Sequence, residues 1–180
     1  MTNGNTIVMS FGDFNLKAND KEHLKDINNI IKMGVLAFKP DLVVVYGSLL
    51  DTSVTTDEYP DLLKQALSSV INANIPICYF GEHPYNDFIP NTYKALANCV
   101  GVNDDIESSL KIKCDLIPKC ERTYSPQIRI SHISEDNELL DAKIYHSEDL
   151  ALENSVITAF SKMLNDNQMG KIKPILELFS

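Results

Sequence analysis

The chain has 180 residues, of which 44% are hydrophobic and 23% charged, as in a globular domain with a hydrophobic core. Its net charge of −9 opposes the phosphate backbone of nucleic acids and the anionic surface of membranes. No apolar segment reaches the ~20 residues that span a bilayer, and the first residues lack a signal-peptide pattern. We therefore expect a single cytoplasmic domain over residues 1–180 that contacts neither nucleic acid nor membrane.

The four cysteines, Cys78, Cys99, Cys114 and Cys120, show no Cys-x-x-Cys spacing and have no paired histidines nearby. A zinc site is therefore not expected. Cys78 lies within an apolar run and is expected to be a small core residue. A disulfide between Cys114 and Cys120 stays open as an alternative to free thiols in a reducing compartment.

The chain begins with a predicted strand at residues 6–11 and a turn-forming loop at residues 12–15. Asn19 is the expected cap of a helix, because Glu22 stands three residues later and can reach back to it. Pro40 prevents this helix from continuing. Its apolar face is formed at helical spacing by Leu24, Ile27, Ile31, Val35 and Phe38.

The central strand of the sheet is predicted at residues 42–46, an unbroken apolar run that contains three valines. Such a run is too short for a helix and indicates a strand buried on both faces, as in a parallel sheet. Gly47 ends the run. Ser48 follows where ligands bind in open α/β sheets, beyond the carboxyl ends of the strands.

A second helix at about residues 60–74 and a third strand at residues 75–80 follow, and Gly81, Glu82 and His83 come directly after that strand. Parallel strands joined by right-handed crossovers point the same way and place their loops at one edge of the sheet. Asp13, Ser48, Glu82 and His83 are therefore expected to converge.

The second half carries weaker signals. Helices are expected at residues 91–100 and 151–164. Strands are expected at residues 110–117, 127–134, 139–145 and 172–179, with a hairpin turn at residues 135–138. The predicted fold class is α/β, with a parallel βαβαβ first half and mixed strands in the second half.

The motif order resembles the calcineurin-like metallophosphoesterases from residue 6 to about residue 102. The family has Asp-x-His after the first strand, Gly-Asp after a Pro-Asp-hydrophobic second strand, and Gly-Asn-His-Asp after the third. From Gln127 onward the chain is weakly similar to the purple-acid-phosphatase-like branch. The resemblance implies a metallophosphoesterase-like layered sandwich and a two-metal site that hydrolyses phosphate esters.

The same resemblance implies that the metal site is degenerate. Asp13 matches the first metal ligand, but Asn15 stands where the family has histidine, and Ser48 replaces the aspartate that bridges the metals. Glu82 replaces the asparagine ligand, and His83 matches the histidine that acts in the family as an acid or a transition-state stabiliser. A neutral serine cannot bridge two cations ~4 Å apart. We expect no cofactor, or at most one weakly bound Mg²⁺, Mn²⁺ or Ca²⁺.

Purely structural roles are the alternative for each of these residues. Asp13 can accept hydrogen bonds from backbone N–H groups, and His83 can be an ordinary loop residue. Ser48 is expected to be a local polar residue rather than a nucleophile, because no Gly-x-Ser-x-Gly sequence surrounds it. The chain also resembles Gly-Asp-Ser lipases at residues 11–13, but the nucleophile position there falls on Phe14, so this reading is disfavoured.

The expected function is therefore that of an inactive or strongly impaired phosphoesterase-fold protein that acts as a binding or scaffolding module. The alternative is a metal-dependent phosphatase with a mononuclear site of Asp13, Asn15, Glu82 and His83. A third possibility is a fragment whose sheet another segment or partner completes. We expect an apolar edge or face that pairs with a protein partner or a second copy.

Overall fold

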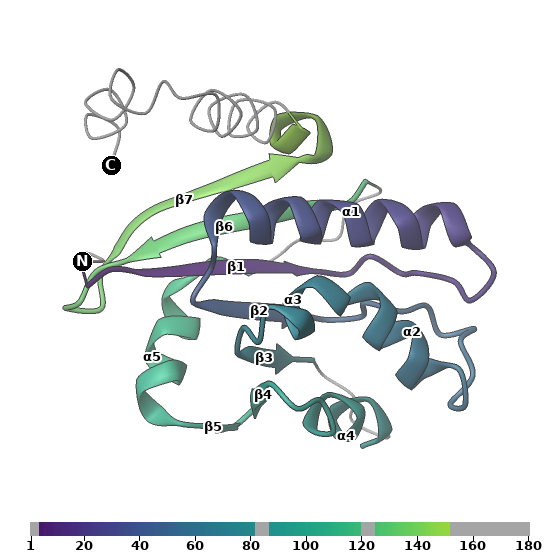
Figure 1. Ribbon diagram of the computed structural model, residues 1–180. Coiled ribbons are helices and arrows are strands. Elements are labelled where there is room, and N and C mark those ends of the chain that lie inside the picture. Colours follow the sequence, from purple (N-terminus) through teal and green to yellow (C-terminus); the bar gives the residue numbers. More distant parts are fainter. Residues whose placement is uncertain (1–3, 82–86, 120–124, 152–180) are drawn as a thin grey trace.

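The structure is a computed structural model, and it describes residues 4–81, 87–119 and 125–151. These residues form an α/β fold around one seven-stranded mixed sheet in the order β5-β4-β3-β2-β1-β6-β7 (Figure 1). The parallel strands are β1 (Thr6–Gly12), β2 (Leu42–Tyr46), β3 (Ile77–Phe80) and β4 (Cys99–Val102). The antiparallel strands are β5 (Asp105–Ile106), β6 (Gln127–Ile133) and β7 (Leu139–His146).

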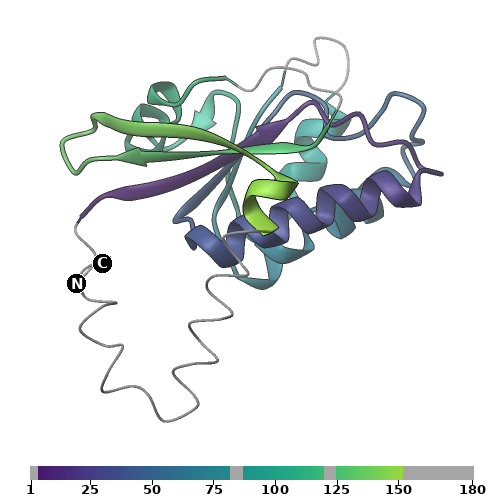
Figure 2. The same cartoon turned by 90° about the horizontal axis from the view of Figure 1, so that it is seen from above.

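Helices cover both faces of the sheet. They are α1 (Lys21–Phe38), α2 (Tyr59–Ala66), α3 (Ser68–Asn72), α4 (Phe88–Lys94) and α5 (Ser108–Leu116). Figure 2 shows α1 on one side of the sheet and α5 on the other. Residues of α1 to α3 belong to the larger hydrophobic cluster, whereas Cys114 of α5 belongs to a smaller cluster on the opposite face.

Strand β2 has the central position that the apolar run predicts. Val43 and Val45 pack in the larger cluster, while Val44 and Tyr46 pack in the smaller one. All five residues of β2 are buried, because both faces of the strand are covered. The prediction that the first three strands are adjacent and parallel is confirmed.

The helix α1 is capped one residue later than predicted. The side chain of Asp20 accepts a hydrogen bond from the backbone N–H of His23 at 2.9 Å, whereas Asn19 is exposed. The helix ends as predicted before Pro40, where Lys39 takes a left-handed conformation with φ 47°.

The second helix is divided into α2 and α3 instead of running unbroken over residues 60–74. The chain turns at Leu67, whose carbonyl accepts hydrogen bonds from the N–H groups of Val70 and Ile71, both at 3.0 Å. Leu67 and Val70 are both fully buried as a result of this turn.

Two predictions about the second half are wrong. The helix expected at residues 91–100 ends at Lys94, and the short β-branched segment that follows pairs with β3 as β4. The strand expected at residues 110–117 is the helix α5. Its apolar residues alternate with polar ones, but Leu110, Cys114 and Ile117 also recur at helical spacing, and these residues face the core.

The hairpin predicted from residue 127 to residue 145 is confirmed. Strands β6 and β7 are antiparallel, and the N–H of Ser134 donates to the carbonyl of Glu138 at 2.9 Å across the turn. The helix predicted at residues 151–164, apart from its first residue, and the strand predicted at residues 172–179 lie outside the described residues. Within residues 4–81, 87–119 and 125–151, no helix is long and apolar enough to span a membrane.

Candidate functional site at the carboxyl edge of the sheet

The loops that follow β1 and β2 run side by side beyond the end of the sheet. The N–H of Asp13 donates to the carbonyl of Tyr46 at 3.3 Å, and the N–H of Asn15 donates to the carbonyl of Ser48 at 3.4 Å. The N–H of Leu16 continues the series with the carbonyl of Leu49 at 3.1 Å. Asp13 and Ser48, two of the four residues expected to converge, therefore lie together, and Asn15 lies on the same pair of loops.

The side chain of Asp13 ties the two loops to each other. Its Oδ1 atom accepts a hydrogen bond from the backbone N–H of Ser48 at 3.0 Å. Gly47 makes this approach possible, because a Cβ atom there would lie 2.2 Å from Asp13 Oδ1. Gly47 also has φ 63°, a conformation that glycine adopts without strain.

Gly47 is held from the other face of the sheet by Tyr79. The Tyr79 hydroxyl donates to the carbonyl of Gly47 at 3.2 Å. The Tyr79 ring stacks on Tyr93, with ring centroids 3.9 Å apart and planes within 8°. Burial raises the pKa of both tyrosines well above its ordinary value, so both stay neutral at physiological pH.

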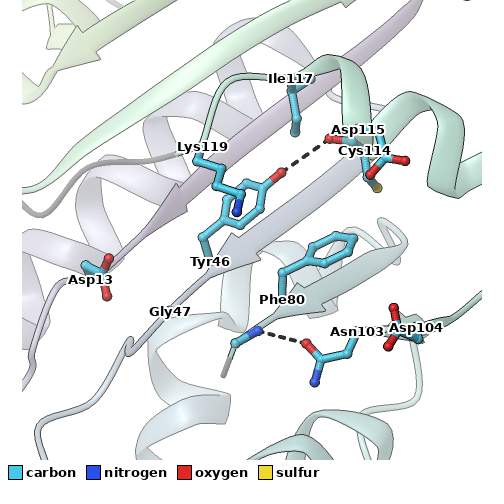
Figure 3. Close-up of a pocket in the computed structure, with 11 residues that line it drawn as sticks. Asp13, Tyr46, Gly47, Phe80, Asn103, Asp104, Cys114, Asp115, Ile117 and Lys119 are labelled. Carbon is cyan, nitrogen blue, oxygen red and sulfur yellow. Dashed lines mark hydrogen bonds between the residues drawn. The ribbon is translucent and has the colours of Figure 1, made fainter. Parts of the chain in front are cut away.

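A cavity of about 650 Å³ opens beside these loops, between the carboxyl ends of the parallel strands and α5. Figure 3 shows Asp13 at one end, Asp104 and Asp115 at the other, and Tyr46, Phe80 and Lys119 between them. Its lining residues are Asp13, Tyr46, Gly47, Phe80, Gly81, Asn103, Asp104, Cys114, Asp115, Ile117 and Lys119. The volume is in the range of small-molecule sites.

Aromatic rings and loop hydrogen bonds shape the interior of this cavity. Tyr46 and Phe80 stack with centroids 5.5 Å apart, and the Tyr46 hydroxyl donates to the carbonyl of Cys114 on α5 at 3.4 Å. The N–H of Gly81 donates to Asn103 Oδ1 at 2.9 Å, which joins the loops after β3 and β4 (Figure 3). These contacts connect α5 and three strand ends into one pocket.

The described charges of the pocket are mainly negative. Asp13, Asp104 and Asp115 face one cation, Lys119. The backbone of the Lys119 segment is fixed by Arg129 of β6, whose guanidinium Nη1 donates to the carbonyls of Pro118 at 2.8 Å and Lys119 at 3.0 Å. The negative potential therefore favours a cationic or hydrogen-bond-donating ligand over an anionic one.

Cys114 and Cys78 form a buried thiol pair beneath the pocket. Cys78 is fully buried, which confirms its predicted place in the core, and both thiols belong to the smaller cluster. The hydrogen bond with Cys114, and then burial, raise the pKa of the Cys78 thiol, while the same hydrogen bond lowers the pKa of Cys114. Cys114 is a free thiol, and Cys120, with which the sequence left a disulfide open, lies outside the described residues.

The remaining predicted site residues, Glu82 and His83, lie outside the described residues. Within the described parts of the chain, no group of three or more His, Cys, Asp and Glu side chains is placed to hold a metal ion. Two further histidines lie on the hairpin: His132 is opposite Asp141 in the register of β6 and β7, and His146 is the last residue of β7.

Sequence reasoning missed the pocket residues that follow β4 and those on and after α5. Asn103 and Asp104 were not considered because β4 was assigned to a helix, and Asp115 and Lys119 because α5 was taken as a strand. The signal was present in part, since a short β-branched run before Asn103 and Asp104 repeats the strand-then-polar-loop pattern of β1 to β3.

The fold and this site together define an α/β protein with a ligand-sized pocket at the carboxyl edge of a mixed sheet. No family model, curated protein or solved structure matches the chain.

Proposed function

We propose that the protein is a metallophosphoesterase-like chain that has lost its dinuclear metal centre and acts as a binding or scaffolding module. The hydrogen bond from the Ser48 N–H to Asp13 Oδ1 is the observation that carries this proposal. The carboxylate that matches a metal ligand of the resembled family is engaged here in holding two loops together. Ser48 supplies no charge to offset the repulsion between two cations.

The charges of the pocket also support a role without phosphate hydrolysis. Asp13, Asp104 and Asp115 would repel a phosphate ester, and Lys119 alone among the described lining residues would attract it. Phosphoryl transfer depends on positive groups or metal ions around the transferred phosphate. A ligand that presents a cation or hydrogen-bond donors to the carboxylates, and an apolar surface to Tyr46 and Phe80, fits this lining better.

The strand order supports the proposed metallophosphoesterase-like architecture. Four parallel strands lie beside an antiparallel hairpin that pairs with β1. The motif order from residue 6 to about residue 102 is the second support for this assignment.

A metal-dependent phosphatase with a mononuclear site is the second candidate. The observation that favours it is the convergence of Asp13 and Asn15 within one loop, where Asn15 Nδ2 donates to the Asp13 carbonyl at 3.4 Å. Asp13, Asn15, Glu82 and His83 would be the ligands and the acid of this site. Oxygen ligands of this kind suit Mg²⁺, Mn²⁺ or Ca²⁺.

Metal analysis of the purified protein, together with an aryl phosphate assay in Mn²⁺, Zn²⁺ and Mg²⁺, separates the two candidates. The binding-module proposal expects less than one equivalent of metal and no turnover above the buffer rate. One metal with saturable, metal-dependent turnover supports the mononuclear phosphatase. Two stoichiometric metals with such turnover contradict the loss of the dinuclear centre.

A further inference from the structure

Among the described residues, β7 is the outer strand at one edge of the sheet. It pairs with β6 without interruption from His146 to Asp141 and again at Leu139, with a register irregularity at Leu140, and no other strand among the described residues pairs with its second edge (Figure 1). Three apolar side chains of this strand are exposed: Leu139 by 38%, Leu140 by 55% and Ile144 by 39%. A long edge strand with exposed apolar side chains is a template for pairing with another strand.

Contacts within one chain also order β7 in the absence of a partner. The Tyr145 ring packs on Phe38 of α1 with centroids 4.8 Å apart, and Lys143 Nζ lies 4.8 Å from the centre of the Tyr145 ring. The N–H of His146 donates to Asp149 Oδ2 at 3.1 Å at the end of the strand. Because the edge is ordered in advance, pairing requires little loss of conformational entropy.

The sequence of β7 is complementary to itself in one antiparallel register. When two copies pair about a two-fold axis at Ala142, Asp141 of each copy lies opposite Lys143 of the other. Leu140 of each copy then lies opposite Ile144 of the other. Opposite charges and paired apolar side chains stabilise directly facing positions of antiparallel strands.

The charges of Asp141 and Lys143 distinguish this register from its neighbours. Moving the axis by one residue places either Asp141 against Asp141 or Lys143 against Lys143, and such like-charged pairs are destabilising. An axis that lies midway between Ala142 and either of its neighbours places Asp141 and Lys143 opposite uncharged residues of the other copy. The register about Ala142 therefore pairs both charges with opposite charges and places the exposed Leu140 opposite the exposed Ile144.

We propose that β7 is a self-association surface, through which two copies of the chain join antiparallel about Ala142 and continue the sheet from one copy into the other. This inference names a partner for the proposed scaffolding role, namely a second copy. It involves no residue of the carboxyl-edge pocket, so its failure and a failure of the proposed function are distinguishable.

Charge-reversal variants of the full chain test both the surface and the register. The unmodified protein should sediment at about twice the 20.2 kDa of one chain. Asp141→Lys places two lysines of each copy against two lysines of the other, and Lys143→Asp does the same with aspartates. Each variant alone should weaken the dimer about tenfold or more, because two attractive pairs become repulsive.

Two further experiments restore opposite charges at the facing positions, and both should restore the dimer if the register is right. The double variant Asp141→Lys, Lys143→Asp should dimerise again, because opposite charges face each other. An equimolar mixture of the two single variants should form heterodimers for the same reason. Leu36→Lys is the matched control, since Leu36 is an exposed apolar residue (57%) on α1 that this register leaves outside the interface.

Circular dichroism of each variant verifies that the fold is retained, so that loss of the dimer is not loss of structure. A monomeric unmodified protein at high concentration overturns the proposal, including the case in which residues 152–180 of the same chain cover β7. A dimer that both single variants leave unchanged, or a mixture that forms no heterodimer, also overturns it.

Discussion

Asp13 Oδ1 accepts a hydrogen bond from the Ser48 backbone N–H at 3.0 Å, which joins the loops after β1 and β2 through one carboxylate. The first prediction follows from this contact. Asp13→Ala should destabilise the protein by about 1–2 kcal/mol, because the Ser48 N–H loses its partner in a half-buried loop. Asp13→Asn keeps an acceptor oxygen at the same place and should cost less than half as much.

Urea unfolding of both variants measures this difference. Equal losses for the two variants would contradict the structural role of Asp13, since only the alanine variant removes the acceptor. Asp13→Asn also serves as a metal control, because it removes the negative charge on which the mononuclear alternative depends.

The second prediction is that Ser48→Asp increases the affinity for Mn²⁺ without restoring phosphatase activity. The new carboxylate would lie beside Asp13 and give a cation a second charged ligand. Asn15 would still stand where the resembled metallophosphoesterases have a histidine ligand. Ser48→Asn has nearly the same shape but no charge, so it should leave the Mn²⁺ affinity unchanged in calorimetric titrations.

The third prediction concerns the two stacked tyrosines. The hydroxyl of Tyr93 is buried and has no hydrogen-bond partner among the described residues, whereas the hydroxyl of Tyr79 donates to the Gly47 carbonyl. Tyr93→Phe should therefore stabilise the protein by about 1 kcal/mol, and Tyr79→Phe should destabilise it by about the same amount. Thermal or urea unfolding measures both, and a clear loss of stability in Tyr93→Phe would contradict the unpartnered hydroxyl.

The fourth prediction is a loss of stability in alkaline solution. Burial raises the pKa of Tyr59 and Tyr79 in the folded state well above the ordinary value for tyrosine, which is about 10. Above pH 10 the unfolded chain releases tyrosine protons that the folded chain retains, so the free energy of unfolding falls as pH rises. Each tyrosine contributes up to about 1.4 kcal/mol per pH unit.

Urea unfolding between pH 8 and pH 11 checks this dependence. The loss from these two tyrosines should be absent below pH 9 and develop above pH 10. The double variant Tyr59→Phe, Tyr79→Phe should show a smaller slope above pH 10, because it lacks two of the groups involved. An unchanged slope would mean that other groups cause the alkaline loss.

Much of the first half of the fold could be read from local patterns. The apolar run of β2 is too short for a helix and is buried on both faces, which required a parallel sheet with helices on each side. Gly47 marked the end of that strand, and the common direction of parallel strands predicted that Asp13 and Ser48 would meet.

Assigning α5 and β4 required the tertiary structure. The segment from Leu110 to Ile117 fits a strand by alternation and a helix by spacing, and its sequence does not decide between them. In the fold, Cys114 and Ile117 pack over β2 and β3, which leaves Ile112 48% exposed and selects the helix.

Local patterns predicted the first three parallel strands and the edge of the sheet where their loops meet, because these depend on neighbouring residues and on the fixed geometry of parallel sheets. Only the tertiary structure decided that Asp104, Asp115 and Lys119 join Asp13 around one cavity. Contacts between residues so distant in the chain depend on which face each element buries, and that choice belongs to the packed protein as a whole.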